Sequence, residues 1–297
     1  MQWRNLIAAC SAIAVFGFAL GMTYPLLSLL LEADGISTNM IGINAAMSPI
    51  GILLFSPAIP YFSKRYGSRN TAMAAVLITS ALLIGYKVFD SLEAWFIVRL
   101  LHGMSIATLF VLSEAWVVRY AGNEHRGKVV AIYGAILSAS FGAGPALVGW
   151  IGIDGWAPFV IGALVLLFSI IPLALLKEDT APPLEESSTG SLFSFAARAP
   201  VLLIAVAVFA IFDAASLSFI PVYGLQIGLE LRIAALSLTV LIIGNVVLQF
   251  PIGWMVDRIS KRAVMLACSL MTVVFACLLP VVVGSAWMWP VLVALGA

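Results

Sequence analysis

Long runs of apolar residues follow one another along most of the chain, and short polar segments separate each run from the next. A helix needs about 20 apolar residues to cross the hydrocarbon core of a bilayer, so this pattern predicts membrane-spanning helices. A tenth span begins near residue 287, and nine complete spans precede it: 5–31, 40–62, 70–89, 94–117, 128–153, 156–176, 200–226, 233–256 and 263–285. The predicted fold is an all-α membrane protein.

One segment between the runs is long and polar, and it follows the sixth predicted span. It is rich in Glu, Pro, Ser and Gly, the composition of a flexible linker. We therefore expect a six-helix bundle over residues 1–176, a cytoplasmic linker over 177–199 and a second bundle over 200–297. Because the chain ends within the tenth span, we expect a fragment, truncated in its second half, of a protein with about twelve spans.

The composition agrees with this class. Hydrophobic residues make up 63% of the chain, charged residues 10%, and the mean hydropathy is +1.12, whereas soluble domains carry about 25% charged residues. Cys10, Cys268 and Cys277 all fall within predicted spans, which gives neither a disulfide framework nor metal-ligand spacing. We expect no cofactor, no metal and no nucleic-acid partner, and a monomer in the lipid bilayer.

The placement of charge along the chain predicts its orientation. Lys87 and Arg232 lie in segments on one side of the predicted membrane, Arg99 lies inside a span, and the rest of the 15 Lys and Arg residues lie on the other side: Arg4, Lys64, Arg65, Arg69, Arg119, Arg126, Lys128, Lys177, Arg198, Arg258, Lys261 and Arg262. Since basic residues stay on the cytoplasmic side, we expect a multi-pass protein of the cytoplasmic membrane with its N-terminus inside the cell.

A short basic motif occurs twice, each time between two apolar runs. The stronger copy is 253–262, Gly-Trp-Met-Val-Asp-Arg-Ile-Ser-Lys-Arg, and the weaker copy is 60–69, Pro-Tyr-Phe-Ser-Lys-Arg-Tyr-Gly-Ser-Arg. Pro25 and Pro221 also occupy matching places, late in the first and seventh spans. These repeats indicate two related halves, an arrangement typical of transporters.

Together these motifs resemble the major facilitator superfamily. The 253–262 segment is similar to its loop motif, Arg99-Leu100-Leu101-His102-Gly103 to its Arg-x-x-Gln-Gly motif, and 21–25 to its proline-bearing first helix. The glycine–proline motif of its drug/proton antiporters is similar to Gly144, Pro145 and Gly149. The subgroup most similar is efflux-like, with a glutamate late in the fourth helix, here Glu114.

The resemblance implies a major-facilitator-type bundle and a secondary transporter that moves a small organic molecule by alternating access, with proton-coupled efflux. It also implies a cytoplasmic gate between the halves, formed by Gly253, Asp257, Arg258, Lys261, Arg262, Lys64, Arg65 and Gly67. The first copy carries Pro60 and Lys64 where the family has glycine and aspartate, so latching would depend on the second copy. His102 stands where the family has glutamine.

Charged residues within the spans are candidates for the transport pathway, because a charge at the bilayer centre costs about 2.5–3.5 kcal/mol on insertion scales. Asp213 lies near the centre of the seventh span. Apolar surroundings favour the protonated form of a carboxyl group, so Asp213 is a candidate proton carrier or cation-binding group. The alternative is a protonated aspartate that makes a hydrogen bond between helices.

Arg99 and Glu114 lie on one broad face of the fourth span, which they share with His102. A rise of about 1.5 Å per residue separates the two charges by about 22 Å, so they could mark the two ends of one pathway. Glu114 could instead pair with Arg119 or a loop arginine, and His102 could be a packing residue.

Polar residues at helical spacing are weaker candidates. Asn245 and Gln249 lie one turn apart on the eighth span, and Asn44 and Ser48 on the second. Hydrogen bonds between helices explain both pairs as well as substrate contact does. Tyr24 could line the cavity from the first span, while Gly144, Pro145 and Gly149 are interpreted as hinge or packing positions.

Two other functions remain to be considered. An importer or facilitator for a metabolite would use the same fold, and the sequence separates it poorly from an exporter. A membrane enzyme would need paired catalytic groups at similar depth, and no such pair, nucleophile motif or phosphate-binding loop is present. We therefore do not expect an enzyme.

Overall fold

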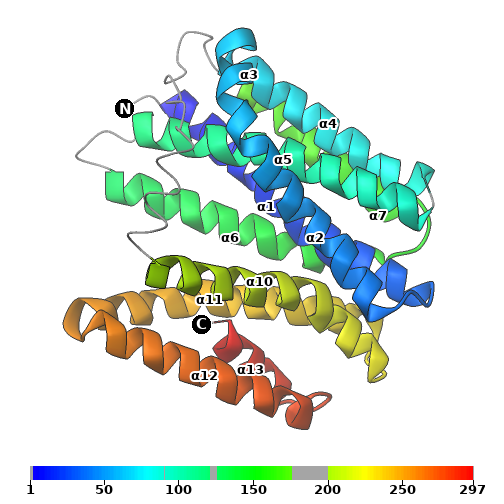
Figure 1. Cartoon of the computed structure of the whole chain (residues 1–297), viewed down its shortest axis with the longest axis vertical. Coiled ribbons are helices and arrows are strands. Elements are labelled where there is room, and N and C mark those ends of the chain that lie inside the picture. Colours follow the sequence, from blue (N-terminus) through cyan, green and yellow to red (C-terminus); the bar gives the residue numbers. More distant parts are fainter. Residues whose placement is uncertain (1–2, 90, 121–125, 176–199, 297) are drawn as a thin grey trace.

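Helices account for the regular structure of the computed structural model, which describes residues 3–89, 91–120, 126–175 and 200–296 (Figure 1). Their bounds are α1 (Trp3–Ala33), α2 (Thr38–Phe55), the 3-10 turn η1 (Ser56–Ala58), α3 (Ile59–Tyr66), α4 (Ser68–Val88), α5 (Leu92–Tyr120), α6 (Arg126–Ile151), α7 (Ala157–Phe168), α8 (Ile170–Ala174), α10 (Pro200–Gln226), α11 (Leu231–Arg258), α12 (Lys261–Val282) and α13 (Met288–Leu295).

Nine helices or helix pairs within the described ranges are long and apolar enough to cross a membrane. They coincide with the nine predicted spans, and α13 begins where the tenth was expected. The all-α class is confirmed. The predicted linker 177–199 lies outside the described residues.

Two spans differ from the uninterrupted helices that the sequence predicts. The second runs on to Tyr66 through the 3-10 turn η1, because Pro57 and Pro60 provide no backbone N–H for the helical ladder. The sixth divides into α7 and α8 at Ser169, whose hydroxyl donates to the Leu166 carbonyl at 2.7 Å. Both interruptions lie at residues that withhold or compete for backbone hydrogen bonds.

The first group of helices, α1 to α8, forms the N-terminal lobe, held together by close contacts between backbones. Helix α1 packs on α6, and α2 packs on α5. A Cβ atom added at Gly144 would collide with the backbone of Gly21, and one at Gly103 with the carbonyl of Ser48. These helices therefore touch without intervening side chains, as small residues allow in membranes.

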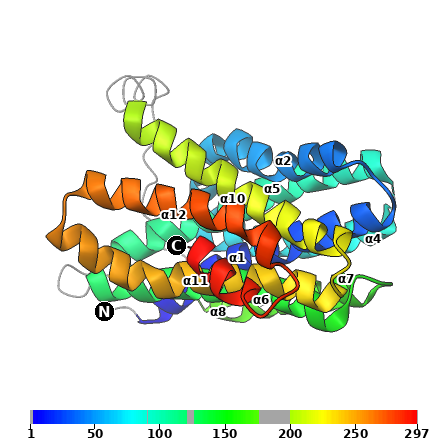
Figure 2. The ribbon, with the colours of Figure 1, turned by 90° about the horizontal axis from the view of Figure 1, so that it is seen from below.

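Helices α10 to α13 form a second group, the C-terminal lobe, which lies along one side of the first (Figures 1 and 2). Helix α11 packs on α6, and α10 packs on α1. Within the lobe, α13 fits against α11 and α12. The central core belongs to the N-terminal lobe, where α1 is buried along most of its length.

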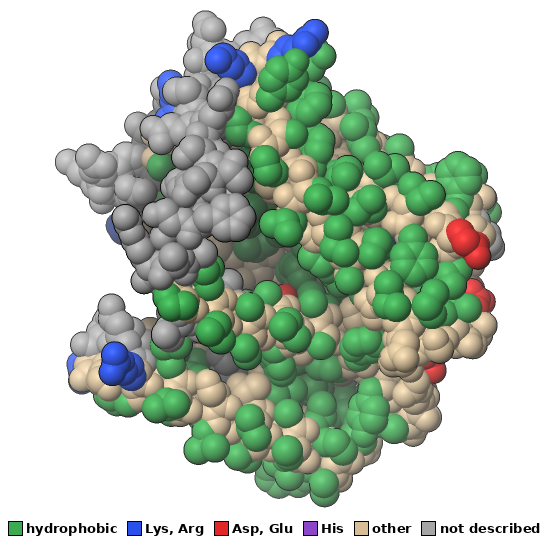
Figure 3. Space-filling view, viewed as in Figure 1, with side chains coloured by type: hydrophobic (Ala, Val, Ile, Leu, Met, Phe, Trp, Pro, Cys, Tyr) green, Lys and Arg blue, Asp and Glu red, His purple; other side chains and the backbone are tan. Residues whose placement is uncertain are grey.

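Charged side chains separate toward the two ends of the helices. Figure 3 shows Lys and Arg along the upper and left edges of the view and Asp and Glu along the right edge. We call the first the basic end, which includes Arg4, Lys64, Arg65, Arg119, Lys128, Arg258 and Arg262. The acidic end includes Glu32, Asp34, Glu93, Asp154 and Glu230.

Candidate functional site

The two lobes meet most closely near the acidic end. The Gln226 amide donates to a Glu32 carboxylate oxygen at 2.9 Å, which joins α10 to α1. The Thr239 hydroxyl of α11 donates to the Gly142 carbonyl of α6 at 3.1 Å. Toward the basic end, Figure 3 shows a hollow between the lobes. The lobes are therefore joined at one end and parted at the other.

A group of buried polar and aromatic side chains lies inside the N-terminal lobe, and we call it the Arg99 cluster: Tyr24, Asn44, Tyr86, Arg99 and His102. Arg99 and His102 are fully buried, one turn apart on α5. Arg99 donates from Nη1 to the Asn44 side-chain oxygen of α2 at 2.8 Å. Its guanidinium carbon lies 4.9 Å from the centre of the Tyr24 ring of α1. Three helices thus converge on one buried charge.

Local packing explains this convergence. Gly103 follows His102 on α5 and lies against the Ser48 backbone of α2, while Gly51 of α2 lies against the Leu100 carbonyl. The two helices approach so closely that Asn44 reaches Arg99. The Tyr86 ring of α4 packs edge-on against His102, with 6.0 Å between ring centres. The Trp95 indole N–H donates to the Tyr86 carbonyl at 2.9 Å and fixes the end of α4.

The cluster has more hydrogen-bond donors than acceptors. The Nε and Nη2 atoms of Arg99, the Nδ2 atom of Asn44 and the Tyr86 hydroxyl have no hydrogen-bond partner among the described residues. Both ring nitrogens of His102 and the Ser48 hydroxyl are likewise unpartnered within that part of the chain. Buried donors without acceptors are costly, about 1–3 kcal/mol each. The cluster is therefore suited to an anionic or acceptor-bearing partner.

Asp213 lies on α10, where this helix leaves the rest of the molecule. Toward the basic end, Val208 and Phe209 are 62% and 60% exposed, whereas toward the acidic end Leu217 and Val222 are 3% and 2% exposed. Asp213 is half-buried between these two stretches. The Tyr24 phenol lies within electrostatic range of both Arg99 and Asp213. Tyr24 is therefore the member of the cluster that relates the buried guanidinium to Asp213 on the other lobe.

Other sequence-predicted pathway residues lie apart from the cluster. Glu114 is exposed on α5 toward the basic end, next to Ser113, whose hydroxyl bonds to the Tyr133 hydroxyl at 2.8 Å. Among the described side chains Glu114 forms no ion pair, so the suggested pairing with Arg119 is not seen there. Asn245 and Gln249 are exposed on α11, in the other lobe.

The glycines around Pro145 occupy packing positions on two faces of α6. Gly144 lies against the backbone of Gly21 on α1. On the opposite face, a Cβ at Gly149 would lie 3.3 Å from the Arg232 carbonyl of α11 and 3.4 Å from the Ala235 side chain. Pro145 is buried within α6. Helix α6 therefore lies at the edge of the N-terminal lobe, where it packs on α1 and on α11 of the other lobe.

The two basic motifs form helical elbows at the basic end. Gly67, with φ of +81°, joins α3 to α4, and Lys64 and Arg65 are exposed just before it. The other elbow joins α11 to α12 through Ser260, whose hydroxyl accepts from the Ala263 amide.

In this second elbow Gly253 and Arg262 are exposed, and the Arg258 guanidinium lies 4.2 Å from the centre of the Trp254 ring. The side chains of Asp257 and Lys261 lie outside the described part of the chain. The latch expected of Asp257 therefore stays a prediction.

The described ranges contain no group of three or more His, Cys, Asp and Glu side chains that could hold a metal ion. Tyr86 is the cluster member that the sequence analysis did not single out. A tyrosine in an otherwise apolar run was the available signal, but only packing places it beside His102. For Asn44 the sequence left both a hydrogen bond between helices and substrate contact open, and the structure shows a hydrogen bond to Arg99 of α5.

Comparison with known proteins identifies relatives along the chain. The model of the Major Facilitator Superfamily matches residues 9–297. The "Uncharacterized MFS-type transporter YfkF" of Bacillus subtilis (strain 168) is 26% identical over 264 residues, which are 86% of this chain and 66% of the relative. "Multidrug resistance protein 1" of the same organism is 22% identical and covers 77% of this chain and 59% of its own length. The chain thus spans less than two thirds of either relative.

Solved structures share the fold. The crystal structure of a bacterial homolog to the human lysosomal transporter Spinster, in its inward-facing and unoccupied conformation, superposes with a TM-score of 0.75. It is 15% identical, and the match covers all of this chain and 73% of the other. At this identity the likeness concerns the arrangement of helices.

Proposed function

Because the chain belongs to the major facilitator superfamily, we propose that it forms part of a secondary transporter that exports a small organic molecule across the cytoplasmic membrane in exchange for protons. Transport would proceed by alternating access, with the substrate bound between the lobes. The basic end would face the cytoplasm, by the rule that positive residues remain inside. The whole protein would act as a monomer.

The observation that carries this proposal is the Arg99 cluster in the N-terminal lobe, together with Asp213 on the other lobe. Arg99 is fully buried, has one side-chain hydrogen bond and keeps two nitrogens without a protein partner among the described residues. Asp213 lies on the other lobe, within electrostatic range of Tyr24, which belongs to the cluster. A buried cation with unpaired donors in one lobe and a carboxyl group on the other support a transport pathway. A substrate that carries hydrogen-bond acceptors would bind there and leave again.

The two groups suggest how protons could be coupled to transport. An ionised Asp213 is costly to bring into apolar surroundings, whereas a protonated Asp213 is neutral and can be buried at a lower cost. Protonation at the carboxyl oxygen would therefore change the energy of bringing the lobes together around the site. In this scheme Arg99 orients the substrate and Asp213 carries the proton.

Contacts between the lobes support an inward-facing state. The Gln226–Glu32 hydrogen bond joins the lobes at the acidic end, and the hollow lies toward the basic end. With the basic end in the cytoplasm, the site would open inward, the state named for the Spinster homolog. The two elbows at the basic end carry the predicted gate residues Arg258, Arg262, Lys64 and Arg65. These elbows would approach each other when the cytoplasmic side closes.

Export is the preferred direction because a multidrug resistance protein is among the relatives. The substrate class would be small organic molecules that enter from the cytoplasm or the inner leaflet. Import of a metabolite on the same fold is the alternative outcome of the test below.

The test uses the full-length protein in proteoliposomes that contain the pH dye pyranine. A panel of lipophilic cations, zwitterions and carboxylates is applied, and proton movement is recorded together with compound flux. We expect Asp213→Asn to abolish compound-driven proton movement while substrate exchange persists, and Asp213→Glu to retain part of it. Unchanged proton-coupled flux in Asp213→Asn would remove this residue from the mechanism. Accumulation in right-side-out rather than inverted vesicles would establish import.

A further inference from the structure

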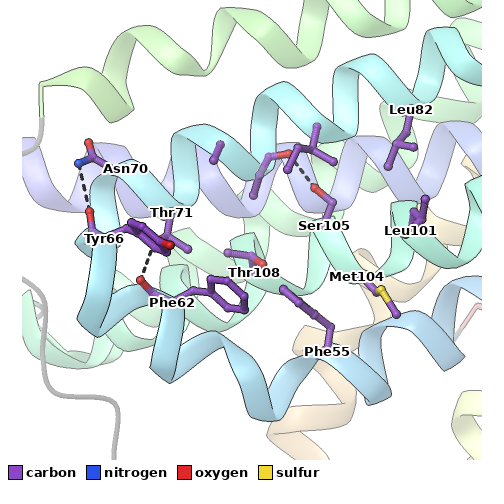
Figure 4. Close-up of a pocket in the computed structure, with 13 residues that line it drawn as sticks. Phe55, Phe62, Tyr66, Asn70, Thr71, Leu82, Leu101, Met104, Ser105 and Thr108 are labelled. Atoms are coloured by element: carbon purple, nitrogen blue, oxygen red, sulfur yellow. Dashed lines mark hydrogen bonds between the residues drawn. The ribbon is translucent and has the colours of Figure 1, made fainter.

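A second site lies on the outer surface of the N-terminal lobe, away from the Arg99 cluster. A groove of about 550 Å³ runs between the α2–α3 segment, α4 and α5. In Figure 4, Tyr66 and Asn70 lie at one end of the groove, Leu82 and Leu101 at the other, and the Phe62 and Phe55 rings lie along one wall.

The groove has the length of one membrane leaflet. Its lining on α4 runs from Asn70 to Leu82, about 18 Å at a rise of 1.5 Å per residue. Half of a hydrocarbon core of about 30 Å is about 15 Å. The groove begins at the elbow of the basic end and runs past the midpoint of α4 as far as Leu82. An acyl chain from the leaflet at the basic end would therefore fit along it.

Several polar atoms in the groove already have partners. The Ser105 hydroxyl bonds to the Ala75 carbonyl at 2.8 Å and to the Thr79 hydroxyl at 2.9 Å. The Thr71 hydroxyl donates to the Gly67 carbonyl at 2.8 Å. A ligand in the groove would meet mainly hydrocarbon and aromatic faces, which favours an aliphatic chain over a sugar or nucleotide.

Positive charge lies at the mouth of the groove. Arg65 is exposed, donates to the Tyr61 hydroxyl at 2.7 Å and places its guanidinium carbon 5.5 Å from the centre of the Tyr66 ring, which lines the groove. Lys64 is exposed on the same turn. Neither forms an ion pair with a described residue. Two basic groups that have no carboxylate partner in the described part of the chain therefore lie at the end where a lipid phosphate would lie.

We propose that this groove binds one anionic phospholipid, with an acyl chain along Phe55, Phe62, Ile78 and Met104 and the phosphate group at Lys64 and Arg65. The complementarity is twofold, apolar in the groove and positive at its mouth. A similar groove of about 400 Å³ lies between α1, α6 and α7, lined by Ser11, Phe18 and Val165 among others. It provides an internal control for the apolar part.

Native mass spectrometry of the purified protein in detergent tests the headgroup. Phosphatidylglycerol and phosphatidylcholine with identical acyl chains are titrated separately. We expect phosphatidylglycerol to bind more tightly than phosphatidylcholine. The double variant Lys64→Gln with Arg65→Gln should weaken phosphatidylglycerol binding about 25-fold, since each basic group near an anionic lipid contributes about fivefold. The matched control pair, Arg119→Gln with Lys128→Gln, removes equal charge at the same end and should leave binding within about threefold of the unmodified chain. Equal losses in both pairs, or equal binding of the two lipids, would overturn the proposal.

A substitution in the groove tests the acyl-chain site. Ala74 is exposed and lines the groove, so Ala74→Trp should fill it and reduce phosphatidylglycerol binding at least tenfold. Val165→Trp, in the groove between α1, α6 and α7, should leave that binding unchanged. Retention of the tight lipid by Ala74→Trp, or its loss in Val165→Trp, would show that the lipid lies elsewhere. A tryptophan at a lipid-exposed position lets both variants fold.

Discussion

The guanidinium carbon of Arg99 lies 4.9 Å from the centre of the Tyr24 ring, which joins a buried charge on α5 to the end of α1 that carries Pro25. A desolvated cation over an aromatic face is stabilised by about 2 kcal/mol. Placing an arginine at the centre of a membrane costs about 2.5–3.5 kcal/mol on insertion scales. Tyr24 therefore offsets much of this cost while leaving Arg99 short of hydrogen-bond acceptors.

The Asn44–Arg99 hydrogen bond is expected to show strong energetic coupling. Asn44→Leu removes the one side-chain acceptor of Arg99 and should lower the free energy of unfolding by about 3 kcal/mol, because a buried charge then loses its partner. Adding Arg99→Met should recover most of this loss, since two apolar groups replace the pair. Thermal unfolding in detergent across the four members of the cycle measures the coupling. Additive effects would contradict it.

Gly144 and Gly134 lie on the same helix and should respond oppositely to alanine. A Cβ at Gly144 meets the backbone of Gly21 and Met22, so Gly144→Ala should destabilise the chain by about 1–3 kcal/mol. At Gly134 nothing lies within 4 Å, so Gly134→Ala should stabilise it by about 0.5–1 kcal/mol through helix propensity. Unfolding midpoints of the two variants provide the measurement. The same sign for both would refute the packing argument.

The Gln226–Glu32 hydrogen bond is expected to bias the balance between states. Gln226→Ala removes a bond worth about 1 kcal/mol, so the population open at the acidic end should rise about fivefold. Spin labels at Ser37 and Ile227, in a background without native cysteines, report the separation of the lobes. Asp154→Asn, another exposed acidic-end position, is the control and should change nothing. An unaltered distance distribution in Gln226→Ala would show that the bond does not hold the lobes.

Orientation in the membrane can be read by labelling single cysteines. With Cys10, Cys268 and Cys277 replaced by serine, a membrane-impermeant maleimide should modify Asp34→Cys in intact cells. It should modify Gly127→Cys only after the membrane is permeabilised. This result follows if the basic end is cytoplasmic. The reverse labelling pattern would place the basic end outside the cell, and the hollow between the lobes would then open outward.

The spans were predictable from the sequence because the cost of placing polar backbone and charge in lipid acts on each segment separately. The break at Pro57 was not predicted, although proline removes a hydrogen-bond donor wherever it stands. The composition of the Arg99 cluster was not predictable in full. Tyr86 meets His102 only because α4 and α5 pack together.

Helical spacing also grouped residues that the structure separates. Arg99 and Glu114 share a broad face of α5, yet Arg99 is fully buried and Glu114 is exposed. The difference arises because neighbouring helices cover only part of this long face. A periodic pattern gives the direction of a side chain, whereas its burial depends on which helix lies opposite.

Backbone contact between α1 and α6, at Gly21 and Gly144, has a mechanical consequence. Helices that touch without intervening side chains have no rotamers to rearrange, so they can turn only as one block. In the transporter that we propose, conformational change would then be confined to the contacts between this block and the C-terminal lobe. The width of the space beside this block would then decide which substrate sizes that transporter accepts, without rearrangement inside the block.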